Sequence, residues 1–347
     1  MITQKEVAKA AGVSNSTAGM ILSGSGARYS ESTRRKVFET AERLGYQKSI
    51  NAKALRLRRS LLFGVLFSQV NSIHAADFLH GLQEGIAGTD FSPLVFFNRT
   101  LQDQLASLDR CLNRRVDALL VNCVAGPGDL DFEAFVRRVS DLKIPVFEVF
   151  GNFIPGAPAM NLDMAGSGSA AVRHLIDLGH RRIALVTHAR FDNRVLHADA
   201  GSHADGYRAE MALAGLSPQI VPVDLDYDRL TPADWCAAGA ASLGQLHASP
   251  APPTAAVCYN DLLAYGLNRA CRRQGIAVPA AMSIIGNGDM MLSSITGPPL
   301  TTMRFDGSQA GLDATRMLLR GIEEGSMNGL SPRLDLVLRE STAKPND

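Results

Sequence analysis

The chain has 347 residues, of which 46% are hydrophobic and 20% are charged. This composition supports a buried core and excludes an intrinsically disordered protein, and the length fits two or three domains. No run of about 18 apolar residues occurs, which excludes a membrane-spanning helix, and the first residues show no secretory signal. The five cysteines are scattered without a CxxC pair, so we expect reduced cysteines in a cytoplasmic protein.

The net charge of +1 conceals an uneven distribution along the chain. Residues 1–60 contain 12 Lys and Arg against 4 Asp and Glu, a charge of +8, whereas residues 61–347 contain 23 against 30, a charge of −7. A small basic segment joined to a larger acidic one is typical of a nucleic-acid-binding module attached to a second domain. Charge alone leaves open the alternative of a solvated basic face.

The first 46 residues predict three helices. The capping box Thr3–Glu6 begins the first helix and Gly12 ends it. Ser14 is the expected N-cap of the second helix, and Ser30 caps a third that ends at Gly45. Two short helices joined by a glycine-containing turn and backed by a third predict a helix-turn-helix, with a generic three-helix bundle as the alternative.

In a helix-turn-helix, the N-terminal side chains of the second helix contact base edges in the major groove. The loop before the third helix supplies further contacts. The predicted DNA-contacting residues of this segment are Asn15, Ser16, Thr17, Met20, Arg28 and Tyr29.

The stretches ITQKEVAKAAGVSNSTAGMIL and YSESTRRKVFETAERLGYQKSINAKALR resemble the N-terminal domain of the LacI (lactose/purine-repressor) family of bacterial transcription regulators. The match runs from Ile2 to about Ser60. It implies a helix-turn-helix domain over residues 1–49 and a hinge helix over residues 50–60, which orders on operator DNA.

In that family a leucine of the hinge helix inserts into the minor groove and kinks the duplex. The resemblance places Leu55 at this position, with Arg56 beside it. Lys53 and Arg56 are expected to contact phosphates, and Asn51 is a plausible N-cap. A helix of about eight residues is marginal in water, so we expect it to fold on binding.

The sequence departs from the family in the recognition helix. The usual Val-Ser-Arg is replaced by Ala18-Gly19-Met20. Met20 cannot make a bidentate contact to guanine, and Gly19 weakens the helix by roughly 1 kcal/mol relative to alanine. We therefore expect the operator to differ from the common one at that base pair.

From Leu61 onward, apolar runs alternate with helical segments, which predicts parallel sheets in two α/β subdomains. The Pro- and Gly-rich segment Asn152–Pro158 is the expected hinge between them. The predicted strands are Leu61–Phe67, Pro93–Phe97, Ala118–Val121, Pro145–Phe150, Arg182–Thr187, Ile220–Val223, Ala255–Tyr259 and Ser283–Gly286.

This part resembles the periplasmic-binding-protein-like effector domain of the same family. The matching stretches are Arg114–Asp117, Leu142–Pro145, Arg173–Ala184, Gly206–Arg208, Tyr259–Leu262, Pro298–Thr302 and Leu338–Ser341. The resemblance implies an N-terminal effector subdomain of residues 61–160 and 298–326. The C-terminal effector subdomain comprises residues 161–297 and 327–341.

The resemblance also implies that a small-molecule effector binds between the subdomains, near the carboxyl ends of strands, where open α/β sheets bind ligands. Helix capping is the alternative role of Asn260, and exposure on the surface is the alternative for the two histidines. The predicted effector-binding residues are Ser72, His74, Asp163, His203, Asn260, Asp289 and Phe305.

Three polar residues of the family pattern are replaced here: His203 stands for an arginine, Gly288 for an aspartate and Phe305 for a glutamine. Each buried sugar hydroxyl without a partner costs roughly 1–3 kcal/mol, so the substitutions argue against a neutral hexose. They favour a ligand with one flat or apolar face, including a carboxylate held by a protonated histidine.

Two catalytic alternatives are weak. Gly166–Ala171 fits GxGxxA, but the acidic residue that a dinucleotide site needs about 20 residues later is absent. Asp192, His197, Asp199 and His203 lie in one loop without the spacing of a metal or acid–base site. We expect no enzyme activity, no cofactor and no metal. A transport-type binding protein is the remaining alternative, and the basic segment counts against it.

The sequence therefore predicts a DNA-binding transcriptional repressor of the LacI type that is controlled by a small molecule. One helix-turn-helix contacts a half-site, so we expect a homodimer on pseudo-palindromic double-stranded operator DNA. No leucine heptads follow the last strand, so no tetramer-forming tail is expected. The protein is expected in the bacterial cytoplasm, at the nucleoid, without a membrane partner.

Overall fold

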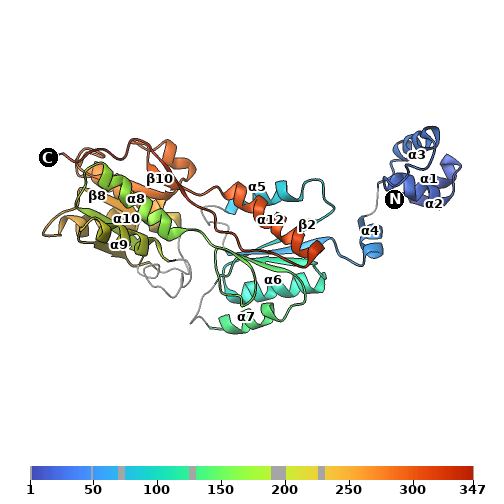
Figure 1. Ribbon diagram of the computed structural model, residues 1–347, viewed down its shortest axis with the longest axis horizontal. Coiled ribbons are helices and arrows are strands. Elements are labelled where there is room, and N and C mark those ends of the chain that lie inside the picture. The colour runs from blue at the N-terminus through green and yellow to red at the C-terminus, as the bar shows by residue number, and fades with distance from the viewer. Residues whose placement is uncertain are drawn as a thin grey trace. The chain divides into compact units, whose positions relative to one another are not determined.

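The computed structural model describes residues 2–47, 50–68, 75–124, 130–188, 201–225 and 231–346, without the side chains of residues 50–52. It divides into two units, Met1–Ser60, here called the head, and Leu61–Asp347, here called the body (Figure 1). In these ranges, every helix is too short or too polar to cross a membrane.

The head contains the three predicted helices, α1 (Gln4–Ala11), α2 (Asn15–Leu22) and α3 (Glu31–Arg43). Each begins at its expected N-cap, because the side chains of Thr3, Ser14 and Ser30 accept hydrogen bonds from backbone N–H groups three residues later. The small core of the head consists of Val7, Ala8, Ala11, Ala18, Ile21, Val37 and Ala41.

The predicted hinge helix is present as α4 (Ile50–Leu57). It begins at Ile50, so Asn51 lies inside the helix and the prediction of Asn51 as its N-cap is wrong. The side chain of Leu55 is 82% exposed and that of Leu57 is 47% exposed. An eight-residue helix with such exposed leucines lacks the packing that normally stabilises a short helix.

The first half of the body forms a sheet of parallel strands in the order β2-β1-β3-β4-β5. Helices α5 and α12 pack on one face, around Phe63, Phe78 and Phe147, and helices α6 and α7 pack on the other, around Leu119 and Phe135 (Figure 1). The strands are β1 (Leu62–Ser68), β2 (Ser92–Asn98), β3 (Ala118–Val121), β4 (Val146–Val149) and β5 (Ala159–Met160). The helices are α5 (Ala75–Ile86), α6 (Leu101–Asn113), α7 (Phe132–Ser140) and α12 (Gly307–Glu324).

The second half forms a sheet in the order β11-β10-β9-β8-β6-β7, in which only the β10–β11 pairing is antiparallel among the described pairings. Helices α10 and α11 pack on one face, and α8 and α9 on the other. The strands are β6 (Ile183–His188), β7 (Gln219–Val223), β8 (Ala255–Cys258), β9 (Ser283–Gly288), β10 (Thr301–Arg304) and β11 (Asp335–Val337). The helices are α8 (Met164–Asp177), α9 (His203–Leu213), α10 (Pro232–His247) and α11 (Asp261–Arg273).

This architecture confirms the predicted fold class, but two subdomain boundaries differ from those predicted. Strand β10 pairs with β9, so the chain leaves the C-terminal sheet after Arg304 and not at residue 298. Leu330 pairs with Met160, so residues 327–330 stay with the N-terminal sheet. The hydrophobic pattern of the sequence did not reveal either feature, because β10 and the bridge are too short to show a periodicity.

The segment expected to be the hinge, Asn152–Pro158, also differs from the prediction. It is followed by β5, which still belongs to the N-terminal sheet, so the crossing falls after Met160. The buried Glu148 carboxylate accepts hydrogen bonds from the backbone N–H groups of Phe153 and Ile154, at 2.9 Å each, and fixes this loop. Burial raises the pKa of Glu148, and these two hydrogen bonds oppose that rise.

Candidate nucleic-acid interface and effector site

The first turn of α2 presents the predicted base-contacting side chains. Asn15 and Ser16 are exposed and Thr17 is half-buried. The Gln4 side chain crosses from α1 and donates to the Asn15 carbonyl oxygen at 2.8 Å and to its side-chain oxygen at 3.1 Å. A Cβ atom on Gly19 would collide with the Gln4 amide, so the glycine that weakens α2 is also what lets Gln4 reach it. The sequence pattern did not reveal this role of Gln4.

Met20, Arg28 and Tyr29 come together beside α2. The Arg28 Nη2 group donates to the Met20 sulfur at 2.9 Å and to the Tyr29 hydroxyl oxygen at 3.0 Å. The guanidinium also lies over the Tyr29 ring, with 5.1 Å between its central carbon and the ring centroid. The structure thus brings together three of the predicted DNA-contacting residues in one cluster.

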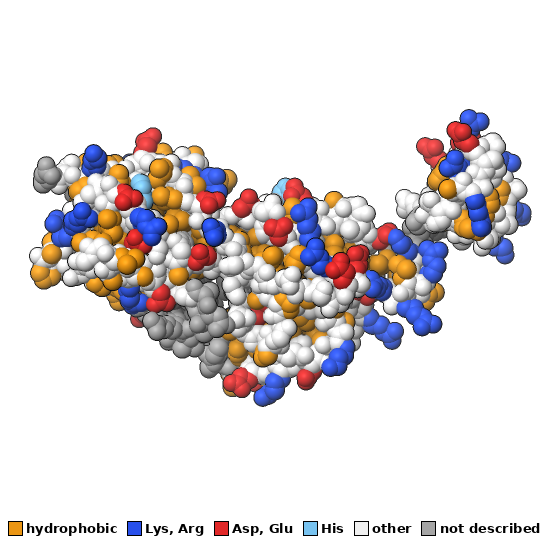
Figure 2. All heavy atoms as spheres, in the orientation of Figure 1, with side chains coloured by type: hydrophobic (Ala, Val, Ile, Leu, Met, Phe, Trp, Pro, Cys, Tyr) orange, Lys and Arg blue, Asp and Glu red, His pale blue; other side chains and the backbone are white. Residues whose placement is uncertain are grey.

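Helix α4 carries the remaining predicted DNA contacts. Leu55 and Arg56 are exposed, and Lys53 is half-buried. Basic side chains gather around this helix (Figure 2), where Arg58 and Arg59 follow it and are also exposed. The helix therefore combines an apolar side chain in solvent with cations that suit a phosphate backbone.

In the body, several predicted effector-binding residues lie at the carboxyl edge of the C-terminal sheet, where they perform structural roles. The Asp163 side chain caps α8 by accepting from Gly166 N at 2.8 Å, and the Asn260 side chain caps α11 by accepting from Leu263 N at 2.9 Å. Helix capping, the alternative kept open for Asn260, is therefore present. Ser72 and His74 lie outside the described residues.

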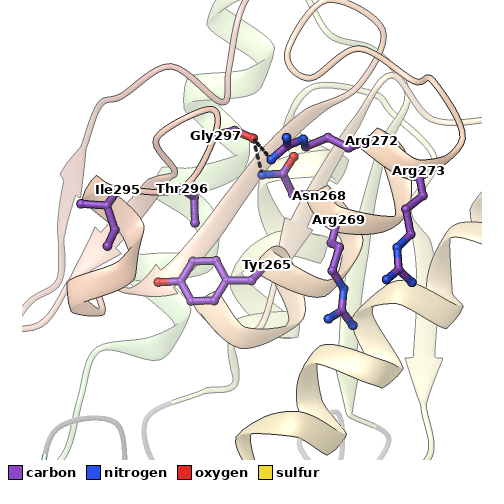
Figure 3. A pocket seen from close by; sticks show the side chains of 8 residues that line it. All are labelled: Tyr265, Asn268, Arg269, Arg272, Arg273, Ile295, Thr296 and Gly297. Carbon is purple, nitrogen blue, oxygen red and sulfur yellow. Dashed lines mark hydrogen bonds between the residues drawn. The ribbon is translucent and has the colours of Figure 1, made fainter.

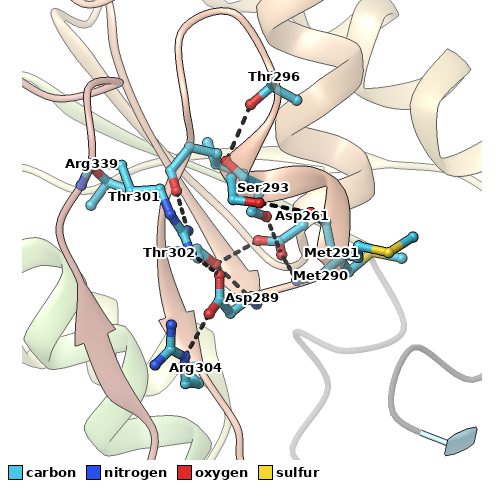
Figure 4. A network of polar contacts seen from close by, with 12 residues as sticks. Asp261, Asp289, Met290, Met291, Ser293, Thr296, Thr301, Thr302, Arg304 and Arg339 are labelled. Atoms are coloured by element: carbon cyan, nitrogen blue, oxygen red, sulfur yellow. Dashed lines mark hydrogen bonds and ion pairs between the residues drawn. The ribbon is translucent and has the colours of Figure 1, made fainter. Parts of the chain in front are cut away.

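Asp289 is held by two arginines (Figure 4). Its carboxylate oxygens accept from Arg304 Nε and from Arg339 Nη2, each at 2.6 Å. The neighbouring buried Asp261 accepts from Thr302 Oγ1 at 2.5 Å and from Met290 N at 2.6 Å. Both carboxylates are thus engaged within the fold, which makes Asp289 a structural anchor between β9, β10 and the chain after β11.

His203, the first residue of α9, is 2% exposed, and neither ring nitrogen has a hydrogen-bond partner among the described residues. Burial lowers the pKa of His203 to about 4, so the imidazole is neutral at neutral pH. Without a neighbouring anion, His203 therefore carries no charge with which to hold a carboxylate. A neutral imidazole offers one donor and one acceptor instead.

Phe305 lies in the aromatic core of the N-terminal subdomain and is 4% exposed. Its ring meets the Phe150 ring edge to face, with centroids 5.7 Å apart, and Phe150 in turn contacts Phe78. The structure therefore separates Phe305, in one core, from His203 and Asn260 on the other sheet.

A group of aromatic side chains at the carboxyl edge of the C-terminal sheet was missed in the sequence. The Trp235 ring stacks on the Tyr259 ring, with centroids 6.2 Å apart and an angle of 21°. His188 contacts Trp235 at 6.0 Å and His203 meets Tyr259 edge to face at 6.3 Å. These four residues are the aromatic group referred to below. They come from the ends of β6 and β8 and the starts of α9 and α10, so no local pattern links them.

The glycines of the GxGxxA match have structural roles. A Cβ atom on Gly166 would collide with the Asp163 carboxylate, and one on Gly168 would collide with the His203 carbonyl oxygen. Helix capping and the close approach of α8 and α9 thus account for both glycines. Of the loop residues weighed as a metal or acid–base site, Asp192, His197 and Asp199 lie outside the described residues.

A surface pocket of about 590 Å³ lies beside α11 (Figure 3). Its walls include Tyr265 and three exposed arginines of the last turns of α11, and Ile295–Gly297 close one side. Asn268 and Arg272 both donate to the Gly297 carbonyl oxygen at 3.4 Å. The short 3-10 helix Met291–Ser294 lies next to this pocket. Met291 is 84% exposed, and Ile295, which follows the helix, is 73% exposed. None of the predicted effector residues that the structure describes lines this pocket.

A helix-turn-helix head followed by a basic hinge helix and a body of two α/β subdomains defines a DNA-binding regulator with a ligand-binding-protein-like body. The family model for bacterial regulatory proteins of the lacI family matches residues 3–49. The model for a periplasmic binding protein-like domain matches residues 172–342. The chain belongs to the lacI family of transcriptional regulators.

Relatives and solved structures agree with this assignment. The ribose operon repressor of Haemophilus influenzae is 27% identical, over 98% of both chains. The HTH-type transcriptional repressor PurR of Photobacterium profundum is 27% identical, over 100% of both chains. The structure of the lac repressor dimer bound to operator and the anti-inducer ONPF is similar in fold, with a TM-score of 0.77, 24% identity and 99% coverage of both chains.

The buried state of His203 predicts a pH dependence of stability. The unfolded chain binds a proton at this residue below pH 6.5, whereas the folded chain does so only near pH 4, so stability is lost as pH falls between these values. Relative to His203→Gln, the wild type is expected to lose about 3 kcal/mol of unfolding free energy across this window. Chemical denaturation at a series of pH values measures the difference, and parallel curves for the two proteins would contradict the prediction.

Proposed function

We propose that this protein is a repressor that binds a pseudo-palindromic operator as a homodimer, and that a small molecule lowers or raises its affinity for this DNA. The observation that carries the proposal is the head itself, where α2 presents a polar first turn and α4 exposes Leu55 among cations. The acidic body has the opposite net charge, so DNA affinity is assigned to the head. The repressor names of the relatives support the same class.

The role of Leu55 can be separated from that of its basic neighbours. Leu55→Ala is expected to weaken binding to a selected operator at least about tenfold and to leave binding to random DNA unchanged, because only the kinked complex uses the inserted side chain. Arg56→Ala is expected to weaken both, because it removes a phosphate contact. Fluorescence anisotropy of the full chain at two salt concentrations measures these affinities.

Leu57→Ala is the matched control, since Leu57 is an exposed leucine of the same helix. It is expected to leave the ratio of operator to random-DNA affinity unchanged. Equal losses on both DNAs for Leu55→Ala would remove the minor-groove role.

The partner in the dimer is proposed to be a second copy that covers the apolar surface next to the α11 pocket. A two-fold dimer follows from the two half-sites that a pair of heads contacts. Met291, Leu292 and Ile295 are exposed within one short stretch of the body, which is the kind of apolar patch that association buries.

Ile295→Glu tests this surface. A carboxylate in place of an apolar side chain must be desolvated when the two surfaces meet, so the dimer dissociation constant is expected to rise at least about tenfold. Sedimentation velocity over a range of concentrations measures it. Leu213→Glu, at a leucine that is 80% exposed at the end of α9, is the control and is expected to leave the dimer unchanged. An unaltered dimer in Ile295→Glu would place the interface elsewhere.

The effector is proposed to be a small, flat and neutral molecule that stacks on the aromatic group. The stacked rings of Trp235 and Tyr259 make this edge of the sheet aromatic, and the neutral His203 has one hydrogen-bond donor and one acceptor without a partner among the described residues. Asp261 and Asp289 are engaged within the fold and are not free for sugar hydroxyls.

Calorimetry against neutral hexoses, sugar acids, nucleobases and aromatic acids tests the effector class. Binding heat is expected with nucleobase-like rings and not with neutral hexoses. His203→Gln is expected to weaken that binding at least about tenfold, because it changes the donor and acceptor geometry. His80→Gln removes an exposed imidazole from α5 and is the control. Micromolar binding of a simple hexose would show that the proposed effector class is wrong.

The proposal assigns no catalytic step, cofactor or metal to the chain, and places it in the bacterial cytoplasm at the nucleoid. It is supported by the repressor names of relatives that share the full length of the chain.

A further inference from the structure

Helix α2 contains no charged side chain: its sequence is NSTAGMIL. A helix in the major groove needs a guanidinium or ammonium group to make the strong two-point contact with O6 and N7 of guanine. Such a contact from this head must therefore come from outside α2.

Arg28, in the loop between α2 and α3, is a cation whose side chain contacts α2. Its Nη2 group donates to the Met20 sulfur at 2.9 Å. Tyr29 also holds the Arg28 guanidinium, because its hydroxyl oxygen accepts a hydrogen bond from Nη2 at 3.0 Å and its ring lies beneath the guanidinium. The hydrogen bond from Arg28 lowers the pKa of Tyr29, as expected for a hydroxyl next to a fixed cation.

The position of this cluster on α2 is also fixed. The Tyr29 hydroxyl contacts the side chain of Thr17 and lies 3.9 Å from the Met20 sulfur. Thr17 and Met20 are three residues apart, so they lie on one face of the helix together with Ser16. Arg28 therefore lies along the side of α2 that presents its polar first turn.

We propose that Arg28, held by Met20 and Tyr29, is the residue that contacts a guanine in each operator half-site. Met20 and Tyr29 are positioning residues in this arrangement. The inference rests on the proposed DNA-binding function and adds a specificity-determining residue to it.

Preorganisation is the physical reason why this arrangement suits base recognition. The hydrogen bonds of the guanidinium to Met20 and Tyr29 both use Nη2, while Arg28 itself is exposed to solvent. A free arginine loses side-chain entropy when it binds, whereas one already held by a ring and a sulfur loses less.

The test uses the full chain and DNA selected from a random library by the wild type. Each guanine of the selected half-site is replaced in turn by 7-deazaguanine, which lacks the N7 acceptor but keeps base pairing. At one guanine, the replacement is expected to weaken wild-type binding at least about tenfold. In Arg28→Ala the same replacement is expected to have no further effect, because the contact is already lost.

Two further variants separate base recognition from charge. Arg28→Lys keeps the charge but loses the planar fork, so it is expected to retain affinity for random DNA and to reduce the 7-deazaguanine effect. Arg35→Ala removes an exposed arginine of α3 whose ion-pair partner is Glu39, and is expected to keep the full effect.

The proposal is overturned if Arg28→Ala keeps the wild-type response to 7-deazaguanine at every position, or if no guanine of the selected site responds in the wild type. The proposed function fails in a different way, because a protein that is not an operator-binding regulator selects no common sequence from the library.

Discussion

The chain passes between the two sheets of the body three times, and the hydrogen bonds on either side of each passage determine the architecture of the body. Met160 pairs with Leu330 in the N-terminal sheet, and Asp163 N then donates to the Pro332 carbonyl oxygen, so two of the crossing segments run together. The remaining crossing, which is the second in chain order, follows Arg304 at the end of β10. Helix α12 joins the N-terminal subdomain after the chain has passed through the C-terminal one, and β11 joins the C-terminal sheet after the chain has returned. Neither subdomain is therefore a continuous segment of sequence.

This constraint explains why so many polar groups near the crossings are committed to the fold. Asp289 joins Arg304, the last residue of β10, to Arg339, which follows β11, so it links chain on either side of two crossings. Glu148 fixes the loop before the first crossing. Buried carboxylates need such partners, because desolvation without them costs several kcal/mol. His203 differs from these groups, because neither of its ring nitrogens has a hydrogen-bond partner among the described residues.

Local features of the fold were predictable from the sequence, whereas features made by distant residues were not. The caps Thr3, Ser14 and Ser30 were predicted because a helix start depends on residues three positions apart. The partners of Asp289 are 15 and 50 residues away, and no spacing rule connects them. The same holds for Trp235 and Tyr259, and the resemblance to a known family supplied the overall order of subdomains that periodicity alone leaves undetermined.

The proposed insertion of the exposed Leu55 into a kinked minor groove would also affect how the protein finds its site. A short helix that is stabilised only when its leucine enters a kinked groove would stay largely unfolded on DNA that resists bending. On ordinary chromosomal DNA the protein is then held by cations alone, and such contacts are weak enough to break and re-form along the duplex. In the proposed arrangement, tight binding would require a deformable sequence, so one exposed apolar side chain would give the molecule both a fast search and a slow release.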